Sequence, residues 1–95
     1  MSALINIFSG VLSIIEQLVW IYSWIIIITA LLSWVRPDPY NPIVQFLNRI
    51  TIPAYELVRR FVKKTFYNGI DFAPLIIIIT LQIVMLILRE VRHAL

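Results

Sequence analysis

The chain has 95 residues, of which 61% are hydrophobic, and it carries a formal net charge of +3. A soluble domain of this length buries too little surface to hide so many apolar side chains, so the composition predicts one small membrane domain over residues 1–95. The chain has no cysteine and a single histidine, His93, which excludes disulfides and Cys-based metal sites and argues against a histidine metal site. We therefore expect no cofactor and no metal.

The first apolar stretch predicts a membrane-spanning helix over about residues 11–35. No charged side chain occurs from Gln17 to Val35, and a hydrocarbon core of about 30 Å needs roughly 20 helical residues. Upstream, polar residues recur every three to four positions from Asn6 and mark one helical face. This upstream segment either lies in the membrane interface or continues the span as one long tilted helix from about residue 4. Its lack of Lys and Arg argues against a cleaved signal peptide.

Glu16 and Gln17 are the polar residues at the beginning of this apolar stretch. Trp20 and Trp34 lie about 21 Å apart along a helix, a spacing that suits anchors at the two membrane interfaces. On this placement the Glu16 side chain falls at or just beyond one interface. We favour a carboxylate at headgroup level, and the alternative is a functional acid within the membrane, because buried charges there mark pathways or partners.

The middle of the chain is basic and amphipathic. Closely spaced prolines end the first helix, and Asn41 is expected to cap a new helix that begins at Pro42. Apolar and polar side chains separate on helical wheels over about 42–50 and again over about 53–66, with a break at Pro53. We therefore expect two short amphipathic helices.

Basic side chains on the second of these helices form the candidate lipid- or partner-binding surface, namely Arg59, Arg60, Lys63 and Lys64. Such a helix lies in the headgroup plane, with its basic half toward water and anionic lipid. Its apolar half could instead cover the transmembrane helices or a partner helix. Because short loops rich in Lys and Arg stay in the cytoplasm, the middle segment is predicted to be cytoplasmic and both chain ends to lie on the other side.

A second apolar stretch predicts another spanning helix over about residues 72–88. A turn is expected at Gly69, Asp71 is expected to cap the helix, and Pro74 suits its first turn. The predicted fold class is an all-α membrane protein, with two transmembrane helices in a hairpin joined by two short, interfacial amphipathic helices.

Gln82 lies inside the second span, about 16 Å beyond its start. An amide at this depth needs a hydrogen-bond partner, for which Ser23, Thr29 or a neighbouring copy are candidates. Arg89 and Arg92 are expected to end the helix at headgroup level.

The letters RPDPYNPIVQFLNRITIP, then VRRF, then GIDFAP before an apolar helix occur in this order between about residues 34 and 88. This order resembles the YggT family of small membrane proteins, although many members have serine where this chain has Ala73. The family-motif positions, whose expected role is structural, are Arg36, Asp38, Asn41, Pro42, Thr51, Pro53, Gly69, Asp71 and Pro74. An ion pair between Arg36 and Asp71 would join the two helix ends.

The resemblance implies an integral protein of a bacterial cytoplasmic (inner) membrane, from a family without an established enzymatic activity. Relatives have been linked to osmotic tolerance, to cell-division or envelope gene neighbourhoods and, in chloroplasts, to haem attachment and nucleoid distribution. Many relatives carry two such modules, so this single module is expected to form a homo-oligomer or to pair with another membrane protein.

Three functional hypotheses follow from these observations. The first is a membrane scaffold or assembly factor that acts through its basic segment on lipid and partner proteins. The second is an oligomeric channel or transporter component in osmotic or ion tolerance, which would use Glu16, Gln17 and Gln82. The third, by family analogy alone, is a haem-handling factor. We expect no enzyme, no nucleic-acid partner and no small-molecule substrate, because the motifs for these are absent from the sequence.

Overall fold

The computed structural model describes residues 2–35, 38–67 and 70–95. Within these ranges the elements, in chain order, are α1 (Ser2–Val35), α2 (Pro42–Phe61), β1 (Phe66–Tyr67), β2 (Ile70–Asp71) and α3 (Ala73–Ala94). The two strands form a short antiparallel ribbon, in which Tyr67 is paired with Ile70. The chain is thus mainly helical, with the ribbon leading into α3.

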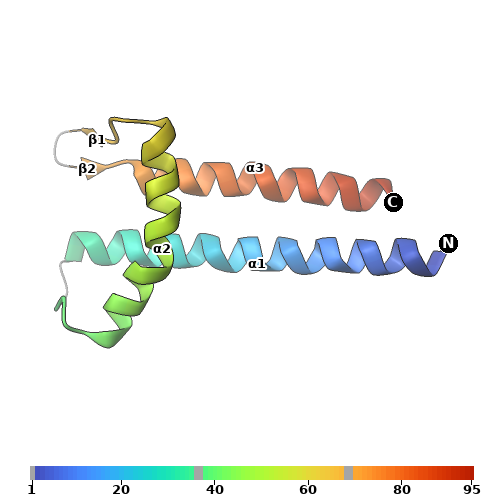
Figure 1. The fold of residues 1–95 in the computed structure, drawn as a ribbon, viewed down its shortest axis with the longest axis horizontal. Helices are drawn as coiled ribbons and strands as arrows, with labels where there is room; N and C mark the ends of the chain where they lie inside the picture. The colour runs from blue at the N-terminus through green and yellow to red at the C-terminus, as the bar shows by residue number, and fades with distance from the viewer. Residues whose placement is uncertain (1, 36–37, 68–69) are drawn as a thin grey trace.

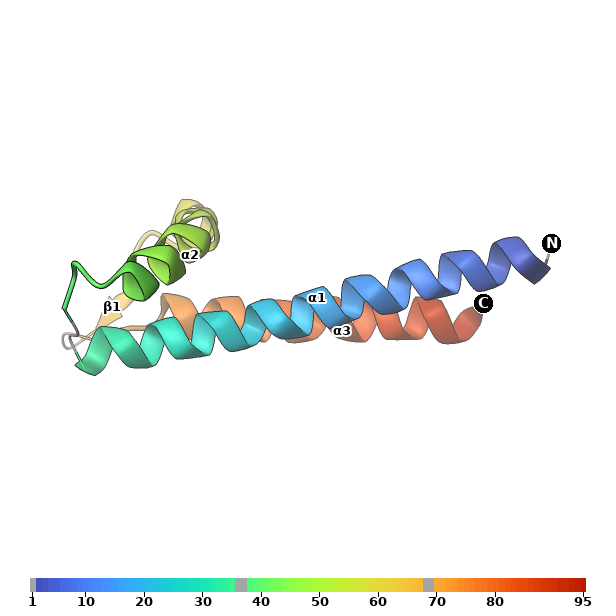
Figure 2. The ribbon, with the colours of Figure 1, turned by 90° about the horizontal axis from the view of Figure 1, so that it is seen from below.

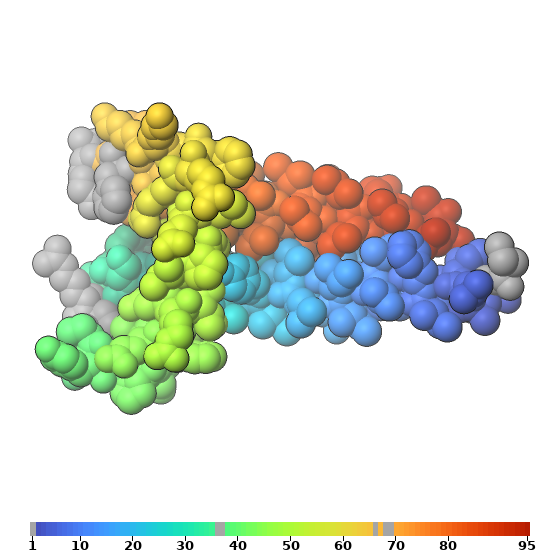
Figure 3. Space-filling model, viewed as in Figure 1, coloured from blue at the N-terminus to red at the C-terminus, as the bar shows by residue number. Residues whose placement is uncertain are grey.

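The helices α1 and α3 lie side by side and antiparallel, and both chain ends are found at the same end of the molecule (Figure 1). Seen from below, these two helices form one layer, and α2 forms a second layer on one face of it (Figure 2). The space-filling view shows α2 as a ridge that crosses both long helices near the end opposite the termini (Figure 3).

A small core forms where the three helices cross. Its members are buried and come from all three helices: Ser23, Ile26, Thr29, Thr51, Ala73 and Ile77. Small side chains dominate this set, which lets helix backbones approach closely. The core therefore fixes α2 against the beginning of α3 and the second half of α1.

Both long helices extend further than the sequence indicated. The structure has one continuous α1 of 34 residues, so the upstream segment continues the helix rather than forming a separate interfacial piece. The second helix continues through Arg89 and Arg92 to Ala94, beyond the expected end at residue 88. These arginines therefore project from α3 itself.

The middle of the chain differs from the expectation of two short helices. Residues 42–61 form the single helix α2, which passes through Pro53 and ends before Lys63 and Lys64. Proline lacks the N–H that would bond to the Arg49 carbonyl, yet the tertiary contacts described below hold the helix together on both sides of Pro53. After Phe61 the chain leaves the helix and continues to β1.

The helices α1 and α3 are each long and apolar enough to cross a membrane, with mean hydropathies of 2.1 and 2.2 in their most apolar windows. Only 17% and 11% of these windows are buried inside the molecule. The core helix of a soluble protein would be mostly buried. These outward-facing apolar surfaces are therefore compatible with a membrane protein.

Candidate functional site

The helix α2 has four distinct sides. Its inward side, which packs on the long helices, repeats every three to four residues and consists of Val44, Leu47, Thr51, Ala54 and Val58. A second apolar side is exposed and consists of Ile43, Phe46, Leu57 and Phe61. An exposed polar side consists of Gln45, Arg49, Glu56 and Arg60. The fourth side lines a groove.

The groove has a volume of about 990 Å³ and lies between α2 and the last turns of α1. Asn48, Ile52 and Tyr55 line it from α2, and Ser33 and Trp34 line it from α1. At about 100° per residue, the groove side and the exposed apolar side lie on opposite sides of α2. The exposed apolar side therefore points toward the part of α1 and α3 that leads to the chain ends.

Two hydroxyl groups bond to carbonyls of α2 near Pro53. The Tyr22 hydroxyl donates to the Ile50 carbonyl at 2.7 Å, and so ties α2 to α1. The Thr51 hydroxyl donates to the Leu47 carbonyl at 2.9 Å and to the Asn48 carbonyl at 3.1 Å. These bonds add hydrogen-bond donors in the turn that Pro53 deprives of one.

Asp71 joins the end of α2 to the beginning of α3. Its carboxylate accepts a hydrogen bond from Arg59 Nη2 at 2.6 Å and another from the Ala73 N–H at 3.0 Å. The guanidinium of Arg59 also lies 5.3 Å from the centre of the Tyr55 ring. Burial, together with the nearby Asp71 carboxylate, raises the pKa of the Tyr55 hydroxyl, so this ring stays neutral. Asp71 thus links two elements with a single side chain.

The beginning of α2 is fixed by local hydrogen bonds. Asn41 is its N-cap and accepts from the Ile43 N–H at 2.9 Å. Asp38 accepts from the Tyr40 N–H at 3.0 Å, which makes a tight turn before the cap. With Pro42 in the first turn, these contacts start the helix at a defined point.

The expected pair between Arg36 and Asp71 cannot be placed, because Arg36 lies outside the described residues, as does Gly69. Asp71 is paired with Arg59. Pro74 lies in the first turn of α3, as the sequence indicated, whereas the N-cap is Phe72 and not Asp71, because Asp71 lies one residue earlier and bonds to the Ala73 N–H. Arg60 is exposed on α2, whereas Lys63 and Lys64 are exposed in the segment after it rather than on the helix. Together these three side chains form a basic end of the α2 region, which we call the basic cluster.

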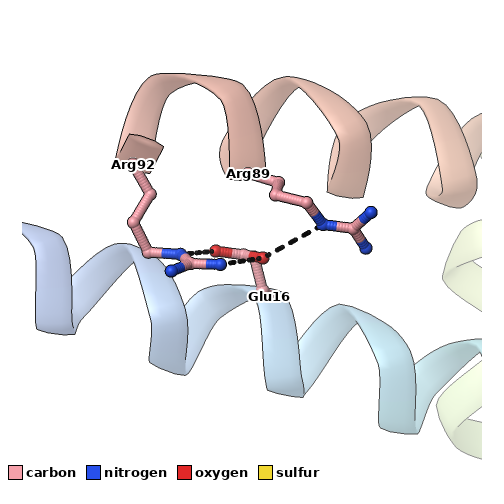
Figure 4. Close-up of polar contacts among 3 residues, drawn as sticks. All are labelled: Glu16, Arg89 and Arg92. Atoms are coloured by element: carbon pink, nitrogen blue, oxygen red, sulfur yellow. Dashed lines mark hydrogen bonds and ion pairs between the residues drawn. The ribbon is translucent and has the colours of Figure 1, made fainter. Parts of the chain in front are cut away.

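A second charged group joins the parts of α1 and α3 that lie toward the chain ends (Figure 4). Arg92 Nε donates to Glu16 Oε2 at 2.6 Å, and Arg89 Nε lies 4.0 Å from Glu16 Oε1. The Glu16 side chain is only 11% exposed. The Glu16 carboxylate is therefore shielded and paired within the molecule, because α3 continues far enough to bring both arginines beside it, and its headgroup-level depth stays a prediction.

The two glutamines of the long helices are exposed. Gln17 borders a small hollow of about 220 Å³, together with Trp20 and Met85. Gln82 makes no hydrogen bond with any described residue. The hydroxyls of Ser23 and Thr29, its candidate partners, instead donate to the Val19 and Ile25 carbonyls of their own helix. Among the described residues, neither hydroxyl forms a hydrogen bond with Gln82.

Sequence reasoning missed two contacts. No local pattern indicates the hydrogen bond between Tyr22 and the Ile50 carbonyl. A tyrosine near a membrane interface is ordinarily explained as an interface anchor. The pairing of Glu16 with Arg89 and Arg92 was also missed, although all three side chains are expected at headgroup level on the side of the chain ends. The sequence does carry a signal for this pairing. Glu16 is the one carboxylate on the polar face of α1, and α3 carries two arginines one turn apart.

Comparisons with known proteins agree with the motif order. A family model described as CCB3/YggT matches residues 8–91. The uncharacterized protein PA0392 of Pseudomonas aeruginosa is 34% identical over 79 residues, which cover 83% of this chain and 39% of that protein. The uncharacterized protein YggT of Escherichia coli K12 is 27% identical over 86 residues, which cover 90% of this chain and 44% of that protein.

The chain therefore spans less than half the length of these curated relatives. No solved structure matches it. The family match extends from the first half of α1 to the last turns of α3, and so includes the groove, the Asp71 contacts and Glu16. The chain belongs to the CCB3/YggT family of proteins.

Proposed function

We propose that this protein is a small integral membrane scaffold or assembly factor. It inserts α1 and α3 across a bacterial inner membrane as a hairpin and holds α2 at the cytoplasmic surface. There the basic cluster binds anionic lipid headgroups and a partner protein. The proposed role is to position other molecules and involves no catalysis.

The arrangement of the sides of α2 carries this proposal. The exposed apolar side points toward the apolar lengths of α1 and α3, while the groove lies on the other side. A helix at a membrane surface needs an apolar side in the acyl boundary and a polar side in water. The observed sides of α2 meet both requirements while its inward side stays packed on the long helices.

Helix lengths support the same placement. A helix of 34 residues is about 51 Å long and one of 22 residues about 33 Å. A bilayer has a hydrocarbon core of about 30 Å and a full thickness of about 40–45 Å. With α2 at one surface, α3 spans the hydrocarbon and α1 extends through both headgroup layers. Glu16 then lies near the far headgroup layer, level with Arg89 where the charge-free part of α3 ends, and its pairing with Arg92 offsets the loss of water around the carboxylate.

The basic cluster supports the orientation. Arg60, Lys63 and Lys64 lie on the α2 side of the molecule, and all are exposed. Basic residues in short connecting segments keep those segments in the cytoplasm, and each contributes about 1 kcal/mol near an anionic surface. The tight attachment of α2 through Tyr22 and Asp71 makes this surface a fixed platform.

In-cell photo-cross-linking tests the scaffold role. A photoreactive residue replaces Arg60 in one variant and Val91, which is exposed near the other end of α3, in a control. We expect position 60 to capture one dominant protein that position 91 does not, and Lys63→Gln with Lys64→Gln to reduce that capture. Capture of only lipid and this chain at position 60 would contradict the proposal.

A channel or transporter component is a second candidate, favoured by the Glu16 ion pairs that join α1 to α3 at the end of the proposed span. Two helices cannot enclose a pathway, so this function needs several copies. Reconstituted oligomers would then conduct ions across vesicle membranes, and Glu16→Ala would change that flux. Absence of flux from the intact oligomer would remove this candidate.

A further inference from the structure

The charged group around Glu16 has one more positive charge than negative. Arg92 donates two hydrogen bonds to the Glu16 carboxylate, whereas Arg89 approaches it only through Nε, at 4.0 Å. The two terminal nitrogens of Arg89 point away from Glu16 (Figure 4) and make no hydrogen bond with any residue that the structure describes. The Arg89 side chain is 48% exposed. One carboxylate thus serves two guanidinium groups, and the second of them can still bind another anion.

Two uncharged hydrogen-bond donors lie close to Arg89. The small hollow beside Glu16 is lined by Ser13, Gln17 and Met85, among others. Arg89 follows Met85 by four residues, so it lies one turn further along the same side of α3. Within the described ranges of the chain, the Ser13 hydroxyl and the Gln17 amide have no hydrogen-bond partner. A hydroxyl, an amide and a guanidinium therefore share one small region of the surface.

The side of α1 that lines this hollow changes from polar to aromatic to aliphatic along its length. Its members follow one another at three or four residues: Ser13, Gln17, Trp20, Trp24 and Ile28. The two tryptophan rings pack edge to face at 6.2 Å, and each side chain is about half exposed. The whole row advances about 22 Å along the helix, which equals half of a full bilayer thickness of about 40–45 Å. A phospholipid has the same length and the same order of polarity.

We infer that this row and Arg89 hold one phospholipid of the leaflet opposite α2. Its phosphate lies on the terminal nitrogens of Arg89, because a guanidinium binds phosphate oxygens through two parallel N–H groups. The Ser13 hydroxyl and the Gln17 amide donate to oxygens of the phosphate or the glycerol. One acyl chain then runs along Trp20 and Trp24, since tryptophan prefers the boundary between headgroups and hydrocarbon.

The charges of the site favour one class of headgroup. The surplus of one positive charge equals the single negative charge of a phosphodiester. Glu16 is already paired, and the exposed Glu90 lies about 100° around α3 from Arg89, so neither carboxylate is placed to receive an ammonium group. The site therefore favours phosphatidylglycerol, whose headgroup has no cation, over phosphatidylethanolamine.

Native mass spectrometry of the full-length protein tests this site. The protein is released from micelles that contain equal amounts of phosphatidylglycerol and phosphatidylethanolamine with the same acyl chains. The background variant combines Arg60→Gln, Lys63→Gln and Lys64→Gln, so that the basic cluster does not contribute. We expect this variant to retain one phosphatidylglycerol in preference to phosphatidylethanolamine.

Arg89→Gln, added to this background, is expected to lower the binding constant for phosphatidylglycerol at least about tenfold, through the loss of charged hydrogen bonds. Arg92 keeps its bonds to Glu16, and circular dichroism checks that the helices remain. Arg49→Gln is the matched control, because it makes the same change at an exposed position of α2, and it should leave the constant unchanged.

A second variant keeps every charge and remains informative if Arg89→Gln does not fold. Ser13→Ala combined with Gln17→Leu removes both uncharged donors and is expected to lower the binding constant about fivefold. Thr80→Val is its control, because the Thr80 hydroxyl donates to the Ile76 carbonyl of its own helix. An unchanged constant in the double variant would overturn the part assigned to these two donors.

Soluble glycerol phosphate distinguishes a lipid from a free phosphate, and an excess of it is expected not to displace phosphatidylglycerol. Displacement, equal retention of the two lipids, or an unchanged constant in Arg89→Gln would each overturn the lipid site. The inference rests on the proposed membrane insertion but not on the scaffold role, so its failure leaves the cross-linking expected at position 60 intact. Failure of α1 and α3 to insert would overturn both.

Discussion

A single carboxylate, that of Glu16, joins α1 to α3 in the half of the molecule that carries the chain ends. Arg92 donates two hydrogen bonds to this carboxylate, at 2.6 and 3.4 Å, and Arg89 Nε approaches it at 4.0 Å. Removing the charge of Glu16 leaves the guanidinium groups of Arg89 and Arg92 without this counter-ion. Because the Glu16 side chain is mostly shielded from solvent, water replaces the lost contact poorly. Such a loss is more damaging than removal of an exposed charge.

We therefore expect Glu16→Gln to lower the midpoint of thermal unfolding in vesicles or micelles by several degrees. Glu90→Gln is the matched control, because it makes the same change of charge at an exposed position of α3. Circular dichroism measures both midpoints. Equal midpoints for the two variants would show that the ion pair does not hold the helices together.

Asp71 has two separable tasks, which two variants distinguish. Asp71→Asn keeps an acceptor for the Ala73 N–H but loses the ion pair with Arg59, at a loss of at most about 1 kcal/mol for so exposed a pair. Asp71→Ala also loses the N-terminal hydrogen bond of α3 and should destabilise the protein by about 1 kcal/mol more. The free energies of unfolding of the two variants test whether Asp71→Ala is the more damaging change. Equal losses would show that the hydrogen bond from the Ala73 N–H to Asp71 does not stabilise the protein.

At the scale of elements, the attachment of α2 depends on few contacts. The helix crosses the long pair rather than running along it, so Tyr22 and the small buried core carry much of the attachment. Its residues after Pro53 are held through Arg59 and Asp71. These contacts attach α2 to its neighbours on both sides of Pro53.

Tyr22→Phe is expected to destabilise the protein by about 1 kcal/mol, the usual loss for one hydrogen bond. Amide hydrogens near Ile50 should then exchange faster, whereas those in the middle of α3 should not change. Tyr40→Phe serves as the control, because Tyr40 is 83% exposed. Hydrogen exchange with mass spectrometry measures the effect, and unchanged exchange in α2 would contradict this role of Tyr22.

Much of the secondary structure could be predicted from the sequence. The apolar stretches, the cap at Asn41 and the proline at the start of α3 are local signals, and they identified the long helices and the beginning of α2. The continuity of α2 through Pro53 was not predicted, because a proline inside a helical pattern is an ordinary signal for the end or a break of a helix. The burial of Glu16 depends on the packing of α3, which no local pattern encodes.

At the scale of the whole molecule, the central claim is that α2 is fixed at a membrane surface by two spanning helices. Two observations support this claim. The helices α1 and α3 are long enough to span a membrane, and the exposed apolar side of α2 lies on the side of the helix opposite the groove. In the proposed placement, the apolar row that α2 exposes would face lipid. The proposed scaffold role depends on this placement.

A spin-label scan of α2 in vesicles tests the claim most directly, since single cysteines can be placed without removing any native ones. Collision rates are measured with oxygen, which concentrates in lipid, and with a water-soluble nickel chelate. We predict that labels at Phe46 and Leu57 collide mainly with oxygen, and labels at Gln45 and Glu56 mainly with nickel. If all four labels collide mainly with nickel, α2 does not lie on the membrane and the claim is contradicted.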